Sequence, residues 1–594
     1  MKYLLIFTIL FYSIDCQKQQ FTYRFSDGSK RKLEELKPNI SEKKWEPLRI
    51  HFEYLSSNYN ENYTSYITEI LEMVSIFFYR FLLVRRMNEK ITFKESYPKQ
   101  FYGFQIKQSL MDQQYDADLV IFVNIENSTK FYKAYCGPTV YDELSLRPII
   151  ALMSWNINYT KIDKTNKIIY ESNLESAIHE IIHGLGITYD YFSKYYDSVT
   201  GKNYENPNFY KQNNITYLST PRLIKFARIY FNCSNLKGIQ MEDNGGPGTS
   251  DFHFERLLLY NELMTGSQLT GNLLITDFTF QLLQDTGFYR ISDYTPDQSQ
   301  WGRNKGCKFV ENYCNNNNFT EFCYQKNIES CSYERTGQSI CMQEILGGQC
   351  MYQQIYTDQF CKNDQNQVQN KSSQIITYYG SDSICLDGSI SPIESYQKFT
   401  CQKFKCDLNN KLKIIIGDLE FDCSQSGSIQ IPNDFFGNLE CPNNPENVCL
   451  FRNDCPNSCG LKGFCINKQC ICSKGYSGLD CQQQCDDYRY QGSCLQNCPN
   501  LTYPLDIIKY CIGCPGNCLN CSNYNQCTKC KSGYLLREGF CDNLLLEKEL
   551  DYQNPEYIDE NNNPQSSDTN SAEIVISTNS NILMMCIILF MLLY

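Results

Sequence analysis

The sequence predicts an α+β domain over residues 45–300, followed by small disulfide-rich modules. This division rests on the distribution of cysteine: of 33 cysteines, 29 lie between residues 307 and 541, and only Cys136 and Cys233 lie in the predicted domain. The chain is 42% apolar, and a stretch of this length can bury a hydrophobic core without covalent cross-links. Beyond residue 307 the apolar runs are short, so disulfides must replace core burial.

A helix is predicted over residues 173–187, "NLESAIHEIIHGLGI". Asn173 is a suitable N-cap, and Gly184 and Gly186 favour an end of the helix after the periodic segment. Apolar residues recur at helical spacing, at Leu174, Ala177, Ile178, Ile181, Ile182 and Leu185.

This helix carries two of the four histidines of the chain, His179 and His183. Residues four apart share one face of a helix, so both rings can direct a nitrogen at the same point. Glu180 lies beside them, where it can act as a base without being a ligand. The pattern H-E-x-x-H therefore predicts a metal site. The alternative, a chance match on a buried helix, is disfavoured because histidine is so scarce in this chain.

A hydrolytic zinc site needs three protein ligands and one open position for water. In a common extension of the motif, a glycine bends the chain and a third histidine follows it. Gly186 has the position of that glycine, but Tyr189 stands where the histidine would be. The remaining candidates are His51, in the predicted strand "WEPLRIHFEYL", where a half-buried structural role is expected, and His253.

His253 is followed after 11 residues by Met264 within "ELMTG". With the helix motif, this resembles the leishmanolysin (M8) family of metzincin metalloproteases over roughly residues 45–310. The family places about sixty residues between the glycine and the third histidine, and 66 lie between Gly186 and His253 here. Further matches are "AYCGPTVYDELSLRPIIALMSWN", "FTFQLLQDTGFY" and "WGRNKGC".

The resemblance implies a metzincin-type catalytic domain, with "ELMTG" as the Met-turn and one Zn²⁺ per chain held by His179, His183 and His253. It implies a zinc endopeptidase of protein or peptide substrates. Glu180 would act as general base toward a zinc-activated water and would pass the proton to the leaving amine. Met264 would pack beneath the histidines without a catalytic step.

Two features depart from the family pattern. Leishmanolysins are kept latent by a propeptide cysteine, but no cysteine lies between Cys16 and Cys136, and the predicted pro or linker segment, 17–44, is short. We therefore expect no cysteine switch unless Cys16 survives signal cleavage. The second departure is the added cysteine-rich array, which catalysis does not require.

The insertion 190–252 within the catalytic domain has two expected parts. Its segment "PRLIKFARIYFNC" predicts a helix. The rest is rich in Asn and Tyr and is expected to be loop.

Several features indicate the secretory pathway. Residues 1–16 read as a signal peptide, and so many cysteines indicate an oxidising compartment. The net charge is −12 without a basic cluster, which argues against a nucleic-acid partner. Ten asparagines lie in N-x-Ser/Thr sequons and make glycosylation an expectation: Asn39, Asn62, Asn127, Asn158, Asn214, Asn232, Asn318, Asn370, Asn500 and Asn520.

The cysteine-rich part divides into three predicted units: a domain over 301–450, a module over 455–481 and repeats over 485–541. The block "CPNSCGLKGFCINKQCICSKGYSGLDC" resembles an EGF-like module. That resemblance implies pairing of its six cysteines as first with third, second with fourth and fifth with sixth.

The C-x2-C steps of 485–541 resemble furin-like repeats, and in a secreted chain disulfides are favoured over zinc knuckles. Without Cys16 and the tail cysteine, 31 cysteines remain. This odd number predicts at least one unpaired or intermolecular thiol.

The end of the chain predicts a lipid anchor. Residues 542–570 are acidic and rich in Asn and Ser, as in a disordered stalk. Residues 571–594 have the polar spacer and the short apolar tail of a GPI-attachment signal, and Asn570 would carry the anchor in the outer membrane leaflet. The tail is too short to span a bilayer securely. We thus expect a GPI-anchored, extracellular enzyme at the cell surface.

A different class of function is a non-enzymatic surface adhesion protein that keeps a protease-like fold and binds through its EGF-like and cysteine-rich modules. Such a protein would be free to lose Glu180 or one histidine. All four positions are present, which favours the enzyme.

Overall fold

The computed structural model describes residues 44–543, except for 56–60, 205, 247, 267–272, 293–294, 313, 315–318, 370–374, 395, 430 and 432–434. The predicted signal peptide, Asn570 and the apolar tail lie outside these residues, as does the predicted stalk except for its first two residues, Asp542 and Asn543, which belong to strand β35 (Phe540–Asn543). No helix among the described residues is both long enough and apolar enough to cross a lipid bilayer.

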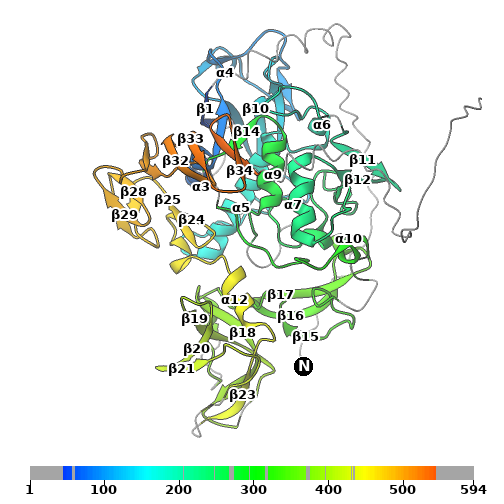
Figure 1. Cartoon of the computed structure of the whole chain (residues 1–594), viewed down its shortest axis with the longest axis vertical. Helices are drawn as coiled ribbons and strands as arrows, with labels where there is room; N and C mark the ends of the chain where they lie inside the picture. Colours follow the sequence, from blue (N-terminus) through cyan, green and yellow to red (C-terminus); the bar gives the residue numbers. More distant parts are fainter. Residues whose placement is uncertain are drawn as a thin grey trace, which may run out of the picture. The chain divides into compact units, whose positions relative to one another are not determined.

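The N-terminal part is built around a four-stranded sheet (Figure 1). Its strands lie in the order β2 (Ile50–Tyr54), β8 (Leu119–Glu126), β10 (Pro148–Asn156) and β9 (Ala134–Tyr141). The first three are parallel, and β9 pairs antiparallel to β10. Among the described elements β9 has only this neighbour, so its other side is an edge of the sheet.

Two helices cover one face of this sheet: α3 (Glu61–Phe81) and α5 (Lys167–Gly184). Side chains of a strand alternate between faces. Accordingly Ile121 and Met153 belong to the core cluster of the helices, while their neighbours Phe122 and Leu152 belong to a second cluster on the other face. The predicted α+β class is thus confirmed, with two cores on opposite faces of one sheet.

The helix predicted over 173–187 is present but begins and ends earlier. Asn166, not Asn173, is the N-cap, since its side chain accepts a hydrogen bond from the Ile169 N–H. The Asn173 side chain is buried and donates to Tyr66 Oη and the Lys161 carbonyl. The capping prediction was wrong because the apolar segment continues upstream of Asn173 through Ile168, Ile169 and Tyr170, so the helix extends back to Asn166.

The insertion 190–252 contains the predicted helix, α7 (Pro221–Phe231). The rest of the insertion was expected to be loop, but it contains a small antiparallel sheet. Strands β11 (Phe209–Gln212) and β12 (Ile215–Leu218) form a hairpin, and β12 also pairs with β13 (Ile239–Gln240). The hairpin turn is made by Asn213 and Asn214, both with positive φ.

Smaller elements complete the first part of the chain. They are β1 (Trp45–Pro47), β3 (Leu82–Arg85) and β14 (Tyr289–Ile291), which form one sheet, β4 (Ile91–Thr92) with β7 (Gln114–Tyr115), β5 (Gln100–Phe101) with β6 (Phe104–Gln105), and the helices α4 (Gln108–Met111), α6 (Tyr189–Phe192), α8 (Arg256–Leu259) and α9 (Asp277–Asp285).

The cysteine-rich part is almost entirely β structure. It comprises α10 (Cys307–Asn312), the sheet of β15 (Glu329–Cys331), β16 (Gly337–Gln343) and β17 (Met351–Phe360), and α11 (Asn366–Gln369). A six-stranded sheet follows, formed by β18 (Ser383–Ser391), β19 (Phe399–Cys406), β20 (Leu412–Ile416), β21 (Leu419–Asp422), β22 (Gly427–Ser428) and β23 (Phe436–Cys441), and then α12 (Pro445–Phe451).

Short hairpins make up the last modules. They are β24 (Gly463–Ile466) with β25 (Gln469–Cys472), β26 (Tyr476–Ser477) with β27 (Gln483–Gln484), the group β28 (Tyr488–Tyr490), β29 (Ser493–Leu495), β30 (Tyr503–Leu505) and β31 (Tyr510–Ile512), then β32 (Cys518–Asn523) with β33 (Gln526–Cys530), and β34 (Tyr534–Arg537) with β35 (Phe540–Asn543).

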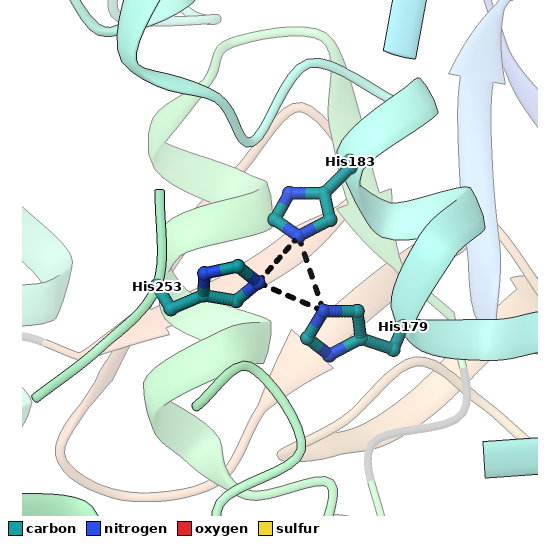
Figure 2. Close-up of side chains that lie close together, drawn as sticks. All are labelled: His179, His183 and His253. Carbon is teal, nitrogen blue, oxygen red and sulfur yellow. Dashed lines mark hydrogen bonds between the residues drawn. The ribbon is translucent and has the colours of Figure 1, made fainter. Parts of the chain in front are cut away.

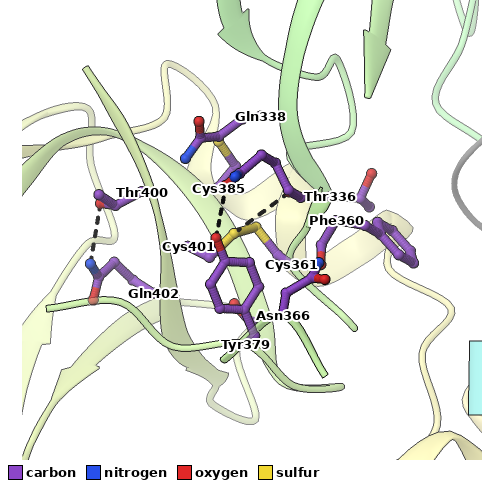
Figure 3. Close-up of a disulfide and its surroundings, with 12 residues drawn as sticks. Thr336, Gln338, Phe360, Cys361, Asn366, Tyr379, Cys385, Thr400, Cys401 and Gln402 are labelled. Atoms are coloured by element: carbon purple, nitrogen blue, oxygen red, sulfur yellow. Dashed lines mark hydrogen bonds between the residues drawn. A yellow bond between two sulfur atoms is a disulfide. The ribbon is translucent and has the colours of Figure 1, made fainter. Parts of the chain in front are cut away.

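Between the two sheets of the cysteine-rich part, the buried contacts are made mainly by disulfides. Figure 3 shows one of them, Cys361–Cys401, which joins the end of β17 to β19. Cys385 and Tyr379 lie beside it in the same small buried cluster. The Tyr379 hydroxyl donates to Gln359 Oε1 at 2.9 Å, so the buried ring has its polar atom satisfied.

The disulfide predictions are largely confirmed. The pairs Cys455–Cys465, Cys459–Cys470 and Cys472–Cys481 have the connectivity implied by the EGF-like resemblance. The cysteines of 485–541 also pair with one another rather than remaining free for zinc. Cys136 is the one free cysteine among the described residues, which accounts for the odd number.

The last modules pack against the first part of the chain. Phe464, in β24, forms an edge contact with Phe77 of α3, with ring centroids 5.6 Å apart. Arg80 of α3 lies 5.0 Å from the ring of Tyr510. Both aromatic residues belong to the same buried cluster as the core of the first part, so burial of α3 depends partly on residues about 400 positions away.

Candidate metal centre

Helix α5 presents His179 and His183 one turn apart on the same face. It can lie close to the sheet because it ends in a glycine: a Cβ atom at Gly184 would come within 2.8 Å of Cys136 Sγ on β9. A larger residue would push the helix away from the strand. The histidines are therefore held against the edge of the sheet.

The structure brings His253 to these two residues. The Nε2 atoms of His179, His183 and His253 are each 3.1 Å from the other two (Figure 2). His253 comes from the segment between β13 and α8, far from α5 in the sequence. The ring nitrogens of the three histidines that we predicted as ligands thus lie within hydrogen-bonding distance of one another.

The other ring nitrogens determine what this point can bind. Each Nδ1 faces a main-chain carbonyl: that of Leu263 for His179 at 2.7 Å, Ile187 for His183 at 2.7 Å and Thr249 for His253 at 2.9 Å. A carbonyl only accepts hydrogen bonds, so each Nδ1 carries the proton. Each neutral ring is then left with a bare lone pair on Nε2.

Three lone pairs without a proton repel one another at 3.1 Å, and a cation between them removes that repulsion. The spacing fits an ion at the usual Zn–N length of about 2.0–2.1 Å. Burial, followed by repulsion from His183, lowers the pKa of His179 to about 3, and burial lowers that of His183 to about 4. Burial also holds the pKa of His253 well below its usual range, so all three rings are neutral at pH 7 and could hold a metal ion.

Gly186 explains why no ligand follows the helix directly. Its φ of 105° turns the chain so that the Ile187 carbonyl comes back to His183 Nδ1. Tyr189 then starts α6, and its ring packs on Phe209 with centroids 5.5 Å apart. The bend therefore returns a hydrogen-bond acceptor to the site instead of a third ligand.

The predicted Met-turn lies against the other side of the site. Met264 is buried, and its carbonyl accepts from the Phe254 N–H at 2.9 Å, next to His253. The preceding carbonyl, that of Leu263, holds His179. This turn thus fixes His179 directly and fixes His253 through its neighbour Phe254. The sequence did not reveal this role because main-chain carbonyls perform it.

Glu180, the proposed base, lies beside the edge strand. Its carboxylate accepts from the main-chain N–H of Cys136 and lies near the ammonium group of Lys133. Burial raises the pKa of Glu180 to about 8, and these two contacts partly oppose the rise. Lys133, whose Nζ donates to the Ser172 carbonyl at 3.1 Å, had no signal in the sequence.

His51 lies apart from this centre. It is on β2, as predicted, but its side chain is 47% exposed and Nε2 lies 3.4 Å from Glu53 Oε2. About half of the side chain is thus exposed, close to the expected half-buried position, and its ring contacts that of Tyr115 with centroids 5.2 Å apart. This placement agrees with the prediction that His253, and not His51, is the third histidine of the site.

Comparison with known proteins agrees with the geometry. A model of the leishmanolysin peptidase family (M8) matches residues 60–345. A leishmanolysin-like peptidase of Drosophila pseudoobscura pseudoobscura is 22% identical over 462 residues, covering 60% of this chain and 65% of that protein. Leishmanolysin of Leishmania major is 27% identical over 190 residues, covering 30% of each chain.

A shorter match is closer in sequence. A leishmanolysin-like peptidase of Caenorhabditis briggsae is 34% identical over 114 residues, covering 19% of this chain and 16% of that protein. The chain thus spans at most about two thirds of the length of these relatives. The family match includes α5, His253 and Met264, and it assigns residues 60–345 of the chain to the leishmanolysin family.

Proposed function

We propose that this protein is a zinc-dependent endopeptidase that hydrolyses peptide bonds of protein or peptide substrates. The observation that carries the proposal is the convergence of three unprotonated Nε2 atoms, 3.1 Å apart, beside the carboxylate of Glu180. His179, His183 and His253 would hold the ion. Bound zinc would make water a nucleophile at neutral pH and polarise the scissile carbonyl.

The residues of the chain would supply the proton transfers. Glu180 takes a proton from the attacking water and delivers it to the amine nitrogen of the departing peptide. The Cys136 N–H fixes one side of this carboxylate, so that its orientation depends on the edge strand. The carbonyls of Leu263, Ile187 and Thr249 keep the histidine rings in the ligand tautomer.

The test is substitution Glu180→Gln in the full-length protein. We expect one zinc per chain and an unchanged fold, with kcat lowered by a factor on the order of 100 or more. Removal of the metal with a chelator should abolish cleavage of casein by the wild type, and added zinc should restore it. His51→Ala serves as the control and should keep both zinc and activity.

A zinc-loaded wild type that cleaves neither casein nor a peptide library would overturn the proposal. That result would favour the adhesion protein, in which the modules beyond residue 455 carry the function. Near wild-type turnover of Glu180→Gln would instead reject the role of that residue.

We further propose that the enzyme lies at the cell surface. Seven of the ten sequon asparagines lie among the described residues, and all seven side chains are exposed, as glycosylation requires: Asn62, Asn127, Asn158, Asn214, Asn232, Asn500 and Asn520. A lipid anchor at Asn570 remains a prediction. Release of the protein from intact cells by a phosphatidylinositol-specific phospholipase C would support it, and recovery of a peptide from 582–594 in the mature protein would reject it.

A further inference from the structure

A cavity of about 530 Å³ is lined mainly by the cysteine-rich part of the chain. Three segments supply most of its walls: residues 300–305, the turn 331–336 between β15 and β16, and residues 442–454, which include α12. None of the three histidines of the metal centre lines it. Its volume lies within the range of about 300–1,000 Å³ that is usual for small-molecule sites. The cavity is therefore large enough for a ligand of its own.

The walls of this cavity carry more basic than acidic side chains. Five basic residues line it, but only two acidic ones do. Two of the five, Lys305 and Arg335, form ion pairs with carboxylates outside the lining, at 3.3 and 2.9 Å. The remaining three are Arg303, Lys362 and Arg452, and their partners decide what the cavity can bind.

Arg452 and Lys362 pair with the same carboxylate. Asp454 forms an ion pair with Nε of Arg452 and with Nζ of Lys362, and the two basic side chains are only 8% and 3% exposed. Nη2 of Arg452 donates to the Ser383 carbonyl at 2.6 Å, but its buried Nη1 has no hydrogen-bond partner among the described residues. Arg452 therefore shares its counter-charge and keeps one charged donor unsatisfied.

Glu334, the other carboxylate of the lining, supplies only part of the missing charge. Burial raises its pKa to about 7, although the Asn261 amide and the charges of Lys362 and Arg452 oppose the rise. The group is thus only partly ionised at pH 7. Burial also lowers the pKa of Arg452, against the attraction of Asp382 and Glu334. The charge of Arg452 would therefore gain from a further anion in the cavity.

Arg303 offers that anion an accessible contact. Its side chain is partly exposed, its Nε donates to the Ser299 carbonyl at 2.8 Å, and its guanidinium lies 4.5 Å from the ring of Tyr230 and 5.4 Å from that of Phe451. These contacts orient the planar group. Its two terminal nitrogens have no hydrogen-bond partner among the described residues. Two free donors in one plane match the two oxygens of a carboxylate.

Free amide side chains line the same cavity. Asn304, Asn443 and Asn444 are exposed, and Asn447 on α12 is partly buried. None of these four side chains has a hydrogen-bond partner in the part of the chain that the structure describes. An amide offers both donors and an acceptor, and a hydroxyl group can bond to either. The amides therefore suit a ligand that carries several hydroxyl groups.

We propose that this cavity binds a sugar acid, that is, a saccharide that carries a carboxylate. Arg303 binds the carboxylate through two parallel hydrogen bonds, and Arg452 adds positive charge from the buried wall. The amides, among them those of Asn443 and Asn447, bind the hydroxyl groups. A simple carboxylate would use only the arginine and a neutral sugar only the amides. The site is separate from the metal centre, and the proposal does not depend on peptidase activity.

Isothermal titration calorimetry of the full-length protein with glucuronate, glucose and acetate tests this proposal. Glucuronate and glucose differ only by a carboxylate in place of a hydroxymethyl group, and acetate has the carboxylate without the hydroxyl groups. We expect glucuronate to bind at least about tenfold more tightly than either of the other two, because each of them leaves part of the site unused. Comparable binding of all three, or no measurable binding of glucuronate, would overturn the proposal.

Two variants locate the site. Arg303→Gln should weaken glucuronate binding about tenfold or more, and Asn447→Ala, which removes one amide from an exposed helix, about threefold. Both should keep the zinc content of the wild type. Arg228→Gln is the matched control, since Arg228 also donates Nε to a main-chain carbonyl, at 2.9 Å, but lies outside the cavity. Unchanged glucuronate binding in both cavity variants, or equal weakening in the control, would place the sugar acid elsewhere and reject the site.

Discussion

The main-chain carbonyl of Leu263 accepts a hydrogen bond from Nδ1 of His179 at 2.7 Å. The bond joins the Met-turn to the helix that carries two of the proposed ligands. The turn is itself fixed from beneath by Glu262, which is buried and whose carboxylate accepts from the hydroxyl groups of Thr276 and Thr279. The geometry of the three histidines therefore depends on a carboxylate that does not face them.

Glu262→Ala tests this dependence. The substitution leaves the Thr276 and Thr279 groups without their acceptor, and we expect a loss of about 2–4 kcal/mol in the free energy of unfolding. Zinc affinity should fall about tenfold, as for residues that orient ligands indirectly. Glu262→Gln keeps the shape and one acceptor and should lose less. Unchanged zinc affinity in a folded Glu262→Ala variant would separate the Met-turn from metal binding.

His253→Ala should lose zinc together with activity, because two histidines on one helical turn leave the ion under-coordinated. Metal content by mass spectrometry is the measurement, with His51→Ala as the matched control. Full zinc occupancy in His253→Ala combined with loss in His51→Ala would mean that the third ligand had been chosen wrongly.

The candidate site was predictable from the sequence because its signals are local or have fixed order. His179, Glu180 and His183 lie on one helical turn, and the Met-turn residue Met264 marks His253. The pairing of the six cysteines from Cys455 to Cys481 agrees with the pairing that the EGF-like resemblance implied. Such patterns can be recognised in the sequence without knowledge of the tertiary fold.

Long-range partners could not be predicted in this way. Asn173 is a good capping residue by type, but its amide is used by Tyr66, 107 residues away. Likewise, no periodicity relates Phe464 to Phe77. The cap and the packing of the last modules are both set by tertiary contacts, which override local preference.

A cluster of ion pairs joins the end of the described chain to helix α7 and strand β14. Asp542 on β35 lies 3.2 Å from Arg222 of α7 and 3.4 Å from Arg290 of β14. The Arg290 side chain is only 1% exposed and that of Asp542 is 9% exposed. Burial alone would raise the pKa of Asp542, but Arg222 and Arg290 outweigh it and the pKa is lowered.

Asp542→Asn should lower the free energy of unfolding by about 2 kcal/mol, because it removes the nearer counter-charge of Arg222 and Arg290 and leaves them only the more distant carboxylates of Asp285 and Glu538. A lowered pKa stabilises the fold above the unfolded value of about 3.9, and that stability is lost as the pH falls below it. The advantage of the wild type over Asp542→Asn should therefore shrink progressively as the pH falls below the unfolded pKa of about 3.9, as measured by urea unfolding at several pH values.

Glu420→Gln is the control for this experiment. Glu420 pairs with Lys405 on the surface, where both side chains are nearly half exposed, and its loss should cause no measurable change. An Asp542→Asn variant as stable as the wild type at pH 7 would show that the last hairpin is not held by its charges.

Thiol reagents should not activate the purified enzyme. Cys136 is the one free cysteine among the described residues; its side chain is buried and its Sγ packs against Gly184. Burial raises the pKa of this thiol well above its usual range, so it is not a reactive thiolate at pH 7. We expect organomercurials to leave peptidase activity unchanged and native Cys136 to resist labelling by dithiobis-nitrobenzoate.

The variant Cys136→Ala distinguishes the sources of any effect. If a mercurial activates the wild type but not Cys136→Ala, the buried thiol controls activity and the prediction fails at this residue. If it activates both proteins, a cysteine outside the described residues, such as Cys16, caps the metal, and latency depends on a thiol after all. Identical activity with and without reagent in both proteins is the expected result, because all other described cysteines are already paired in disulfides.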